Sequence, residues 1–462
     1  MFQQKTYIER RKGLKDRLGK GLVLLFGNEE SPMNYTDNTY HFRQDSTFLY
    51  YFGIQRPGLA AVMDLETGRE IIFGDEYTVE DYVWRGPQPT IAQEAENCGV
   101  SDVHPAGQLA EVLNAAINKK QAIHFLPLYR PENKIRLMEL TGIAPKDTGS
   151  LFSVELVRAV VSQREFKTAE EIAELNQAVD VTVDMHVAAM KMAKAGMTEA
   201  AITGEIYKIA LAAGGNISFP IIATINGQTL HNHYHGNTLK EGDLFLIDAG
   251  YENPMSYAGD LSSTIPVSKK FTTVQKEIYQ LTLDAHQAAI GALGVGVPFK
   301  NAHIAACTTI FEGLKSMGFT RGNTMDAFEA GAHALFFPCG TGHMMGLDVH
   351  DMEDLGEVWV GYDGLPKSTQ FGLKSLRLAK PLQPGHVFTI EPGIYFIPEL
   401  IDLWRSQKKC DEFINWEKVN SYRNFGGIRN EEDFVMTVNG AQLLGKPKPM
   451  TIEEIEEIRG GM

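Results

Sequence analysis

Four acidic residues in the C-terminal half of the chain stand where short apolar runs begin or end. Asp248 closes the run LFLI, and Asp260 opens a β-rich run twelve residues later. Glu391 closes the run VFTI, and Glu431 leads into another apolar run. Two adjacent antiparallel strands would bring Asp248 and Asp260 side by side. Because facing carboxylates repel one another, a fold that gathers them needs a cation between them.

One histidine completes this acidic set. His343 lies in FFPCGTGHMMGLDVHD (336–351), where two preceding glycines let the backbone approach a crowded site. Taken singly, a strand-end aspartate is most often a turn former or a helix cap, and a lone histidine a core residue. The shared position of all five beside Gly or Pro instead favours a metal site. Such an oxygen-rich set suits two divalent ions, with Mn²⁺ the best match and Co²⁺, Fe²⁺ or Zn²⁺ compatible.

The bulk composition limits the classes of function. The chain has 462 residues, too many for one ordinary core, and we expect two domains. A formal net charge of -15 repels phosphate backbones, so we expect no nucleic-acid partner. We expect no membrane partner either, because no uninterrupted run of about 18 apolar residues exists. The N-terminus lacks the core of a secretory signal, and four scattered cysteines fit free thiols in a reducing cytoplasm.

Short apolar runs separated by turns fill the first part of the chain. We expect strands over 22–27, 60–68 and 70–76. Helices are expected over 107–119 and after Pro131. This alternation is typical of an α/β domain.

The pattern changes after residue 167. Thr168 and Glu171 have the spacing of a capping box in front of the long periodic segment 170–196. This spacing predicts a helix that begins there and ends at Gly196.

Two shorter helices are expected after this one, over 198–214 and 273–293. We place the domain boundary between residues 150 and 167. The chain then divides into an N-terminal domain over 1–160 and a C-terminal domain over 161–462.

Taken together, the motifs resemble one known family. DAG, YAGD, GHMMGLDVHD, TIEPGIY and GGIRNEED follow one another in the order found in the pita-bread metallopeptidases, and most closely in the aminopeptidase P and prolidase branch. The segment RQDSTFLYYFGI (43–54) is similar to the N-terminal creatinase-like domain of the same branch. The resemblance implies an α/β (α+β) fold, with a creatinase-like domain followed by a pita-bread catalytic domain.

The resemblance also implies a ligand set for two metal ions. Asp260 and Glu431 would bridge the ions, and Arg429 would support the carboxylates from behind. Asn430 stands where the family usually has isoleucine, so Glu432 is a rival to Glu431; the offset of two residues from Arg429 favours Glu431. The implied ligands are Asp248, Asp260, His343, Glu391 and Glu431.

By the same resemblance, hydroxide shared between the metals attacks the carbonyl before proline. Glu391 would accept the proton of the water and pass it to the leaving proline nitrogen. His350 would contact the scissile carbonyl and His231 the substrate, while Tyr395 would line the proline pocket. His231, His233 and His235 would share one face of a strand, yet only one histidine is needed there.

Two further departures from the family pattern concern the pocket and the first hairpin. Cys339 stands where the family usually has a pocket-lining histidine, so this thiol either faces the substrate or fills space. Asp248 and Asp260 are twelve residues apart, where eleven is common, and we assign the extra residue to the loop 252–256.

The residue Arg377 bears on the type of exopeptidase. In prolidases an arginine at this position grips the terminal carboxylate of a dipeptide, a task suited to a guanidinium. This favours an Xaa-Pro dipeptidase over an Xaa-Pro aminopeptidase, although Arg377 could also be a surface residue.

Two other classes stay as alternatives: a catalytically inactive pita-bread binding module, which would lose ligands, and a creatinase-like metal-free hydrolase. The expected partners are peptides with proline in second position and further copies of the chain, as a homodimer or higher homo-oligomer.

Overall fold

The apolar runs of the first 160 residues build a mixed five-stranded sheet with the order β6-β5-β4-β1-β7. A computed structural model describes residues 1–461 of the chain. β1 pairs antiparallel with β4 and parallel with β7, and both are almost completely buried. The strands are β1 (Leu22–Phe26), β2 (Pro32–Tyr35), β3 (Asn38–Thr39), β4 (Ala60–Asp64), β5 (Glu70–Phe73), β6 (Val103–His104) and β7 (Ile123–His124).

The three predicted strands and two predicted helices of this part are confirmed. The strand expected over 60–68 ends at Asp64, because the following residues form the turn into β5 and Gly68 adopts a φ of 76° there. Leu109, Leu113 and Leu137 bring α5 and α6 into the core of the sheet. The helices are α1 (Gln4–Leu18), α2 (Ser46–Phe52), α3 (Val79–Arg85), α4 (Ile91–Asn97), α5 (Leu109–Asn118), α6 (Pro131–Thr141), α7 (Thr148–Leu151) and α8 (Val154–Arg164).

These elements belong to the first of two units. It comprises Met1–Arg164 together with Met352–Trp359, and the second comprises Glu165–Asp351 together with the chain from Val360 onwards. Each unit has its own buried core. Within residues 1–461, no helix combines the length and the apolar character needed to cross a membrane.

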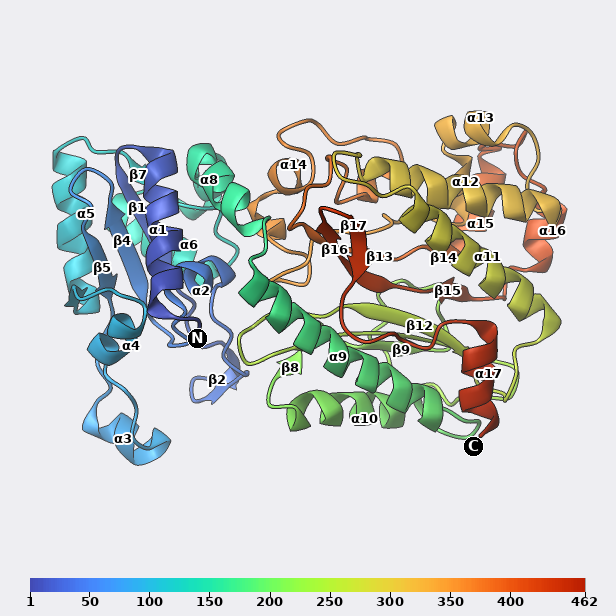
Figure 1. Cartoon of the computed structure of the whole chain (residues 1–462), viewed down its shortest axis with the longest axis horizontal. Helices are drawn as coiled ribbons and strands as arrows, with labels where there is room; N and C mark the ends of the chain where they lie inside the picture. Colours follow the sequence, from blue (N-terminus) through green and yellow to red (C-terminus); the bar gives the residue numbers. More distant parts are fainter. Residues whose placement is uncertain (462) are drawn as a thin grey trace. The chain divides into compact units, whose positions relative to one another are not determined.

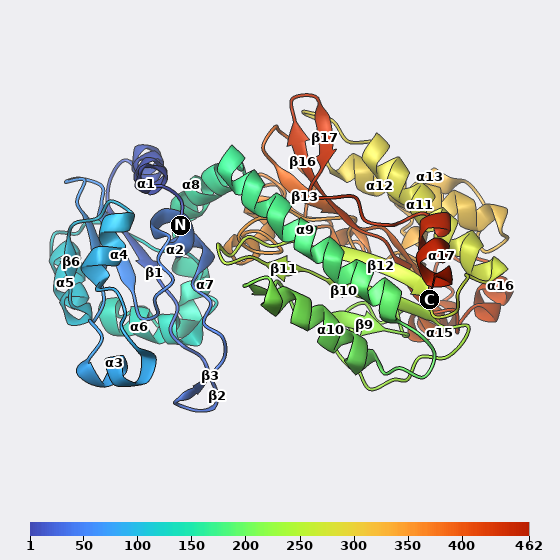
Figure 2. The same ribbon diagram turned by 60° about the horizontal axis from the view of Figure 1, so that its bottom comes forward.

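In the second unit, four long helices enclose small sheets. Figure 1 shows α9 and α10 on one side of the strands and α11 and α12 on the other, and Figure 2 shows α9 running along β10 and β12. The long helices are α9 (Ala169–Met192), α10 (Glu199–Ala212), α11 (Thr273–Gly291) and α12 (Lys300–Ser316). The shorter ones are α13 (Thr324–Glu329), α15 (Pro398–Ser406), α16 (Trp416–Ser421) and α17 (Ile452–Gly460). Three of the four residues of the short helix α14 (Glu357–Val360) belong to the first unit.

Four sheets lie between the helices, with the orders β12-β10-β9, β13-β16-β17, β14-β15 and β11-β8. All of their pairings are antiparallel. The strands are β8 (Asn216–Ile217), β9 (Ile222–Thr224), β10 (Leu244–Ala249), β11 (Tyr251–Glu252), β12 (Leu261–Pro266), β13 (Val387–Ile390), β14 (Gly393–Tyr395), β15 (Gly427–Arg429), β16 (Glu432–Thr437) and β17 (Gly440–Leu443).

The predicted capping box opens α9. The Thr168 hydroxyl accepts a hydrogen bond from the backbone N–H of Glu171, and the Glu171 carboxylate accepts one from the backbone N–H of Thr168. The helix ends at Met192 rather than at Gly196, because Ala193 is already extended. Gly196 lies in the following turn, at a φ of 90°, and its N–H bonds to the carbonyl of Leu239.

Removing this cap should loosen one helix end alone. Thr168→Ala is expected to cost about 1 kcal/mol locally, which speeds amide hydrogen exchange in the first turn of α9 by about fivefold. Thr168→Ser should preserve the protection, because serine keeps the accepting oxygen. As a control, Thr198→Ala at the start of α10 should leave the α9 amides unchanged, and uniform exchange in all variants would contradict the assignment.

Candidate active site

The β10–β12 hairpin brings the first two carboxylates together. Asp248 pairs with Ser262 across the ladder, and Asp260 lies one residue before β12 begins. The two buried aspartates therefore stand at the same end of the hairpin. The chain between them forms β11 and a turn in which Ser256 has a φ of 67°. The predicted antiparallel arrangement is confirmed.

The β13–β16 pair places the two glutamates in the same way. Glu391 follows the last residue of β13, and Glu431 precedes the first residue of β16. Since Ile390 pairs with Glu432, the two glutamates lie at one end of this ladder. His343 lies alongside β13, because its carbonyl accepts a hydrogen bond of 3.0 Å from the N–H of Thr389.

All five predicted ligands line one cavity of about 220 Å³. His343 Nε2 lies 3.3 Å from Asp260 Oδ2 and 3.7 Å from Glu391 Oε1. One ligand atom each from Asp260, His343 and Glu431 lie within 4.8 Å of one another. The folded chain therefore gathers residues that are up to 183 positions apart in sequence.

The imidazole of His343 is oriented by its own loop. Its Nδ1 lies 3.0 Å from the carbonyl oxygen of Met344, so the Nδ1–H donates to that oxygen. Nε2 then carries the lone pair and points at the carboxylates. This is the common arrangement of a metal-binding histidine.

The buried carboxylates carry more negative charge than the chain alone compensates. Within residues 1–461, Oδ1 of Asp248 and Oδ1 of Asp260 are buried without a hydrogen-bond partner. Burial, followed by the charge of Asp248, raises the pKa of Asp260 well above its usual range. Burial and the charge of Asp260 do the same to the pKa of Glu431. These residues fit two divalent cations, which would occupy the open oxygens and neutralise the charge.

Arg429 and Ser262 hold the acidic groups in place. Arg429 donates to Asp248 Oδ2 at 2.5 Å and to the Ser262 hydroxyl at 2.9 Å. The same hydroxyl donates to Glu431 Oε2 at 2.7 Å. Arg429 and Glu431 thus face the same side of their extended segment, as their spacing predicted. Glu432 faces away, with Oε2 3.7 Å from Nε2 of His286.

A further carboxylate was missed by the sequence reasoning. Asp433 is fully buried, and its Oδ2 accepts a hydrogen bond of 3.0 Å from the backbone N–H of Asp260. Its position two residues after Glu431, on the same face of an extended segment, is the signal that could have revealed it. Asp433 therefore fixes the backbone that carries Asp260.

Four predicted substrate residues line the same cavity: His231, Cys339, His350 and Arg377. The rings of His350 and His343 lie 4.2 Å apart. Burial lowers the pKa of His231, so this side chain is neutral near pH 7. Burial and the charge of Glu391 raise the pKa of Cys339 to about 12, which keeps its thiol protonated. Direct contact of these residues with a substrate stays a prediction.

Tyr395, expected to line the proline pocket, lies behind the cavity-lining residue Arg429, and its contact with proline stays a prediction. It is fully buried and is not among the residues that line the cavity. Its hydroxyl oxygen instead accepts a hydrogen bond of 2.9 Å from Nη1 of Arg429. Tyr395 thereby holds the arginine that holds Asp248.

The histidine-rich segment 231–235 does not form the expected strand. His231 and His233 line the cavity, whereas Nε2 of His235 lies 3.0 Å from the carbonyl oxygen of Ile221. The prediction that all three histidines share one face of a strand is wrong. The segment forms no β-ladder and is held by turns and side-chain hydrogen bonds. The apolar part of the cavity wall comes from Phe219, Pro220, Ile222, Leu230 and Val349.

Comparison with known proteins shows the family of the chain. Residues 173–438 match Metallopeptidase family M24, and residues 7–124 match the Aminopeptidase P, N-terminal domain. The chain is 32% identical to the human Xaa-Pro dipeptidase over 451 residues, covering 95% of this chain and 89% of the relative. It is 29% identical to a probable Xaa-Pro aminopeptidase of Uncinocarpus reesii over 455 residues, covering 95% and 90%.

Solved structures agree with these matches. Proline aminopeptidase P II from Yersinia pestis is 25% identical and superposes with a TM-score of 0.82, covering 100% of both chains. Zinc-substituted Escherichia coli aminopeptidase P in complex with product is 25% identical, with a TM-score of 0.81, and covers 100% of this chain and 99% of that chain.

Proposed function

The chain belongs to metallopeptidase family M24, and we propose that it hydrolyses the Xaa-Pro bond of short peptides as an Xaa-Pro dipeptidase. The observation that carries the reaction class is the convergence of four carboxylates and one histidine on one cavity. Relatives over most of the chain include Xaa-Pro dipeptidases and probable Xaa-Pro aminopeptidases. Both names describe hydrolysis of the bond before proline, and they differ in the length of the peptide.

We propose that Asp248, Asp260, His343, Glu391 and Glu431 hold two divalent cations, with Mn²⁺ as the physiological pair. When bound, the cations polarise the scissile carbonyl and lower the pKa of the attacking water. The ligand set is rich in carboxylate oxygens and contains one imidazole, which suits Mn²⁺ better than a soft ion.

Two side chains would move protons and charge during the reaction. Glu391 lines the cavity beside His343, and a carboxylate placed there can serve as the general base. Glu391 would accept a proton from the water and deliver it to the proline nitrogen, which must be protonated to leave. His350, at the cavity wall beside His343, would donate to the carbonyl oxygen as negative charge develops.

Arg377 supports the choice of a dipeptidase. It lines the cavity, and its charge is close enough to act on the pKa values of His231 and Glu391. A guanidinium in the wall of this cavity can bind the terminal carboxylate of a substrate that ends at proline. The structural likeness to aminopeptidase P keeps Xaa-Pro aminopeptidase as the second candidate.

Replacing Arg377 should separate these two functions. Arg377→Ala is expected to lower kcat/KM for Ala-Pro by about 10- to 100-fold, because a hydrogen bond to a charged group contributes about 1.5–3 kcal/mol. Arg377→Lys should retain part of the activity, since it keeps the charge and loses the forked geometry. The effect should appear mainly in KM.

The matched substrate control is Ala-Pro amide, which lacks the carboxylate. Wild type and Arg377→Ala should cleave it at similar rates. Wild-type cleavage of Ala-Pro-Ala as fast as Ala-Pro would instead identify an aminopeptidase. Rapid cleavage of Ala-Ala would contradict the proline specificity itself.

We also propose a cytoplasmic location and a homo-oligomeric state. All four cysteines are free thiols, as expected in a reducing compartment. Sedimentation of the purified protein would test the assembly, and a monomer at all concentrations would contradict it.

A further inference from the structure

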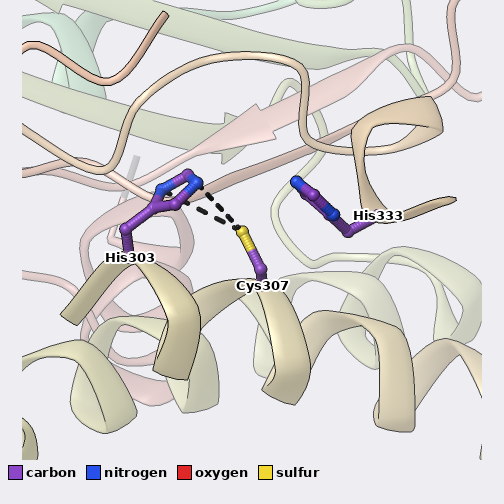
Figure 3. A group of neighbouring side chains, drawn as sticks. All are labelled: His303, Cys307 and His333. Atoms are coloured by element: carbon purple, nitrogen blue, oxygen red, sulfur yellow. Dashed lines mark hydrogen bonds between the residues drawn. The ribbon is translucent and has the colours of Figure 1, made fainter. Parts of the chain in front are cut away.

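A second group of metal-ligand side chains lies in the interior of the catalytic unit. His303 and Cys307 stand four residues apart on α12, and His333 comes from the short 3₁₀ helix Ala332–Leu335 (Figure 3). None of the three lines the active-site cavity. His303 and Cys307 are fully buried, and His333 is 1% exposed.

The helix and the neighbouring loop aim these side chains at one another. Residues four apart on a helix share a face, so His303 and Cys307 project together from α12. Cys307 Sγ lies 3.5 Å from His303 Nε2, and one ligand atom from each of the three residues lies within 4.8 Å of the others. In Figure 3 the ring of His333 approaches the thiol from the side opposite His303.

One ring nitrogen of His303 is engaged by a neighbouring hydroxyl, which leaves the other for a ligand. Its Nδ1 lies 2.9 Å from the hydroxyl oxygen of Thr341, an available acceptor for the Nδ1–H. Cys307 Sγ lies 3.5 Å from Nε2 and 4.0 Å from Nδ1, so the His303 ring would have to turn for its Nε2 lone pair to share an ion with the sulfur. A metal-binding histidine usually fixes its second nitrogen by such a bond.

His333 is the unexplained member of the group. Within residues 1–461, neither of its ring nitrogens has a hydrogen-bond partner, although the ring is buried. The Phe328 ring stacks on it at 4.6 Å, and the backbone of Phe328 influences its pKa without reaching hydrogen-bonding geometry. A buried polar ring of this kind costs free energy unless something binds it.

The space beside His333 is kept open by a glycine. A Cβ added to Gly372 would lie 3.2 Å from Nε2 of His333 and 2.7 Å from the Cβ of Ala334. Gly372 also has a φ of 91°, which other residues rarely adopt. A side chain at residue 372 would therefore displace His333 or Ala334, and glycine leaves the space beside His333 Nε2 free.

We propose that His303, Cys307 and His333 form a buried zinc site, separate from the dinuclear active site. Two imidazoles and a thiolate are the borderline and soft ligands that select Zn²⁺ over Mn²⁺. Bonds of about 2.3 Å to sulfur and about 2.0–2.1 Å to nitrogen place tetrahedral ligands about 3.5 Å apart. The Sγ–Nε2 distance of Cys307 and His303 already equals this spacing, and both imidazole rings would turn to bring their lone pairs onto the ion.

The protonation states suit this ion. Burial lowers the pKa of His303 to about 3 and that of His333 to about 4, so both rings are neutral and have a free lone pair. Burial raises the pKa of the Cys307 thiol, so the thiolate forms only when a cation compensates its charge. On binding, Zn²⁺ takes the sulfur and the thiol proton leaves to solvent.

The site would brace one wall of the catalytic cavity. Thr341, which bonds to His303, also accepts a hydrogen bond of 2.7 Å from the backbone N–H of Glu391 through its carbonyl oxygen. Cys339 lines the cavity and lies near enough to affect the pKa of Cys307. Zinc at this position would tie α12 to the loop 339–341.

Cobalt offers a direct test, because a thiolate bound to Co²⁺ gives a near-ultraviolet charge-transfer band that carboxylate and imidazole ligands do not. The metal-stripped full chain would be loaded with two equivalents of Mn²⁺ and then titrated with Co²⁺. We expect one equivalent to develop the band, and Zn²⁺ to abolish it. Absence of the band from the wild-type protein would overturn the proposal.

Variants assign the sulfur. Cys307→Ser should lose the band, while Cys98→Ser, which alters another buried thiol, should keep it. His333→Phe preserves an aromatic ring beside Phe328 and should weaken Co²⁺ binding at least about tenfold. A band that survives in Cys307→Ser but disappears in Cys339→Ser would place the ion at the cavity wall and contradict the site. Circular dichroism checks that each variant is folded.

Discussion

Asp260→Asn is expected to lower kcat/KM for Ala-Pro by at least about 1,000-fold, the equivalent of about 4 kcal/mol of lost transition-state stabilisation. Asp260 lies between the other groups, 3.3 Å from His343 Nε2 and within 4.8 Å of the ligand atom of Glu431. An asparagine has the same shape but no charge, so it weakens the hold on both cations. The loss should be mostly in kcat and should be only partly restored by excess Mn²⁺.

The same substitution should not unfold the protein. Burial and the neighbouring Asp248 already raise the pKa of Asp260, so removing its charge relieves repulsion in the metal-free state. We therefore expect metal-free Asp260→Asn to melt at the temperature of metal-free wild type or above it. Asp402→Asn, at an exposed ion pair with Arg423, is the matched control and should retain full activity. Wild-type rates in Asp260→Asn with bound Mn²⁺ would contradict the assigned role.

The second large effect is the dependence of metal binding on pH. Burial raises the pKa of Asp260 and Glu431 well above the usual range and raises that of Glu391. The pKa of these carboxyls in the unfolded chain is about 4, and their raised pKa in the folded protein stabilises the metal-free fold below that pH. This contribution is lost as the pH rises through the folded-state pKa values. Metal-free protein should therefore become less stable, through these groups, between acid and neutral pH.

Metal binding should show the opposite trend. Each proton displaced from a ligand makes the apparent Mn²⁺ affinity rise roughly tenfold per pH unit below the folded pKa of that ligand. Calorimetric titrations at several pH values between 5 and 8 would measure this slope. Affinity independent of pH over that range would show that the carboxyls are already ionised without metal.

Comparing metal-free with metal-loaded protein isolates these carboxyls. Burial lowers the pKa of His186 and His286 to about 3, so folding is disfavoured as pH falls below about 6.5, where unfolded histidine charges. The contribution of these two histidines to stability is the same with and without metal. It therefore cancels when the melting temperature of metal-free protein is subtracted from that of metal-loaded protein. The metal-induced rise in melting temperature should therefore grow with pH.

The strand-end carboxylates could be predicted because their position depends on local patterns. Apolar runs defined β10, β12 and β13, and antiparallel pairing then placed Asp248 beside Asp260. The offset of two residues between Arg429 and Glu431 placed both on Ser262. A short-range periodicity was sufficient in each case.

Other features depend on packing between distant segments, which periodicity does not determine. Tyr395 was expected to line the proline pocket, yet it is fully buried and its hydroxyl accepts a hydrogen bond from Arg429 of the cavity wall. His231 and His235 alternate in sequence, but the segment folds as turns and sends them to different neighbours. His333 meets α12 because α13 and the 3₁₀ helix that follows it pack back against α12.

A titration of the metal-stripped full chain with Mn²⁺ tests the two-metal account most directly. Activity on Ala-Pro and bound manganese would be measured together at each addition, with bound metal determined after removal of free ions. We expect no activity in the stripped protein, and full activity when two Mn²⁺ are bound per chain. Full activity of the wild-type protein without bound metal would contradict the two-metal site. An Asp260→Asn variant that binds two Mn²⁺ and keeps the wild-type rate would contradict it as well.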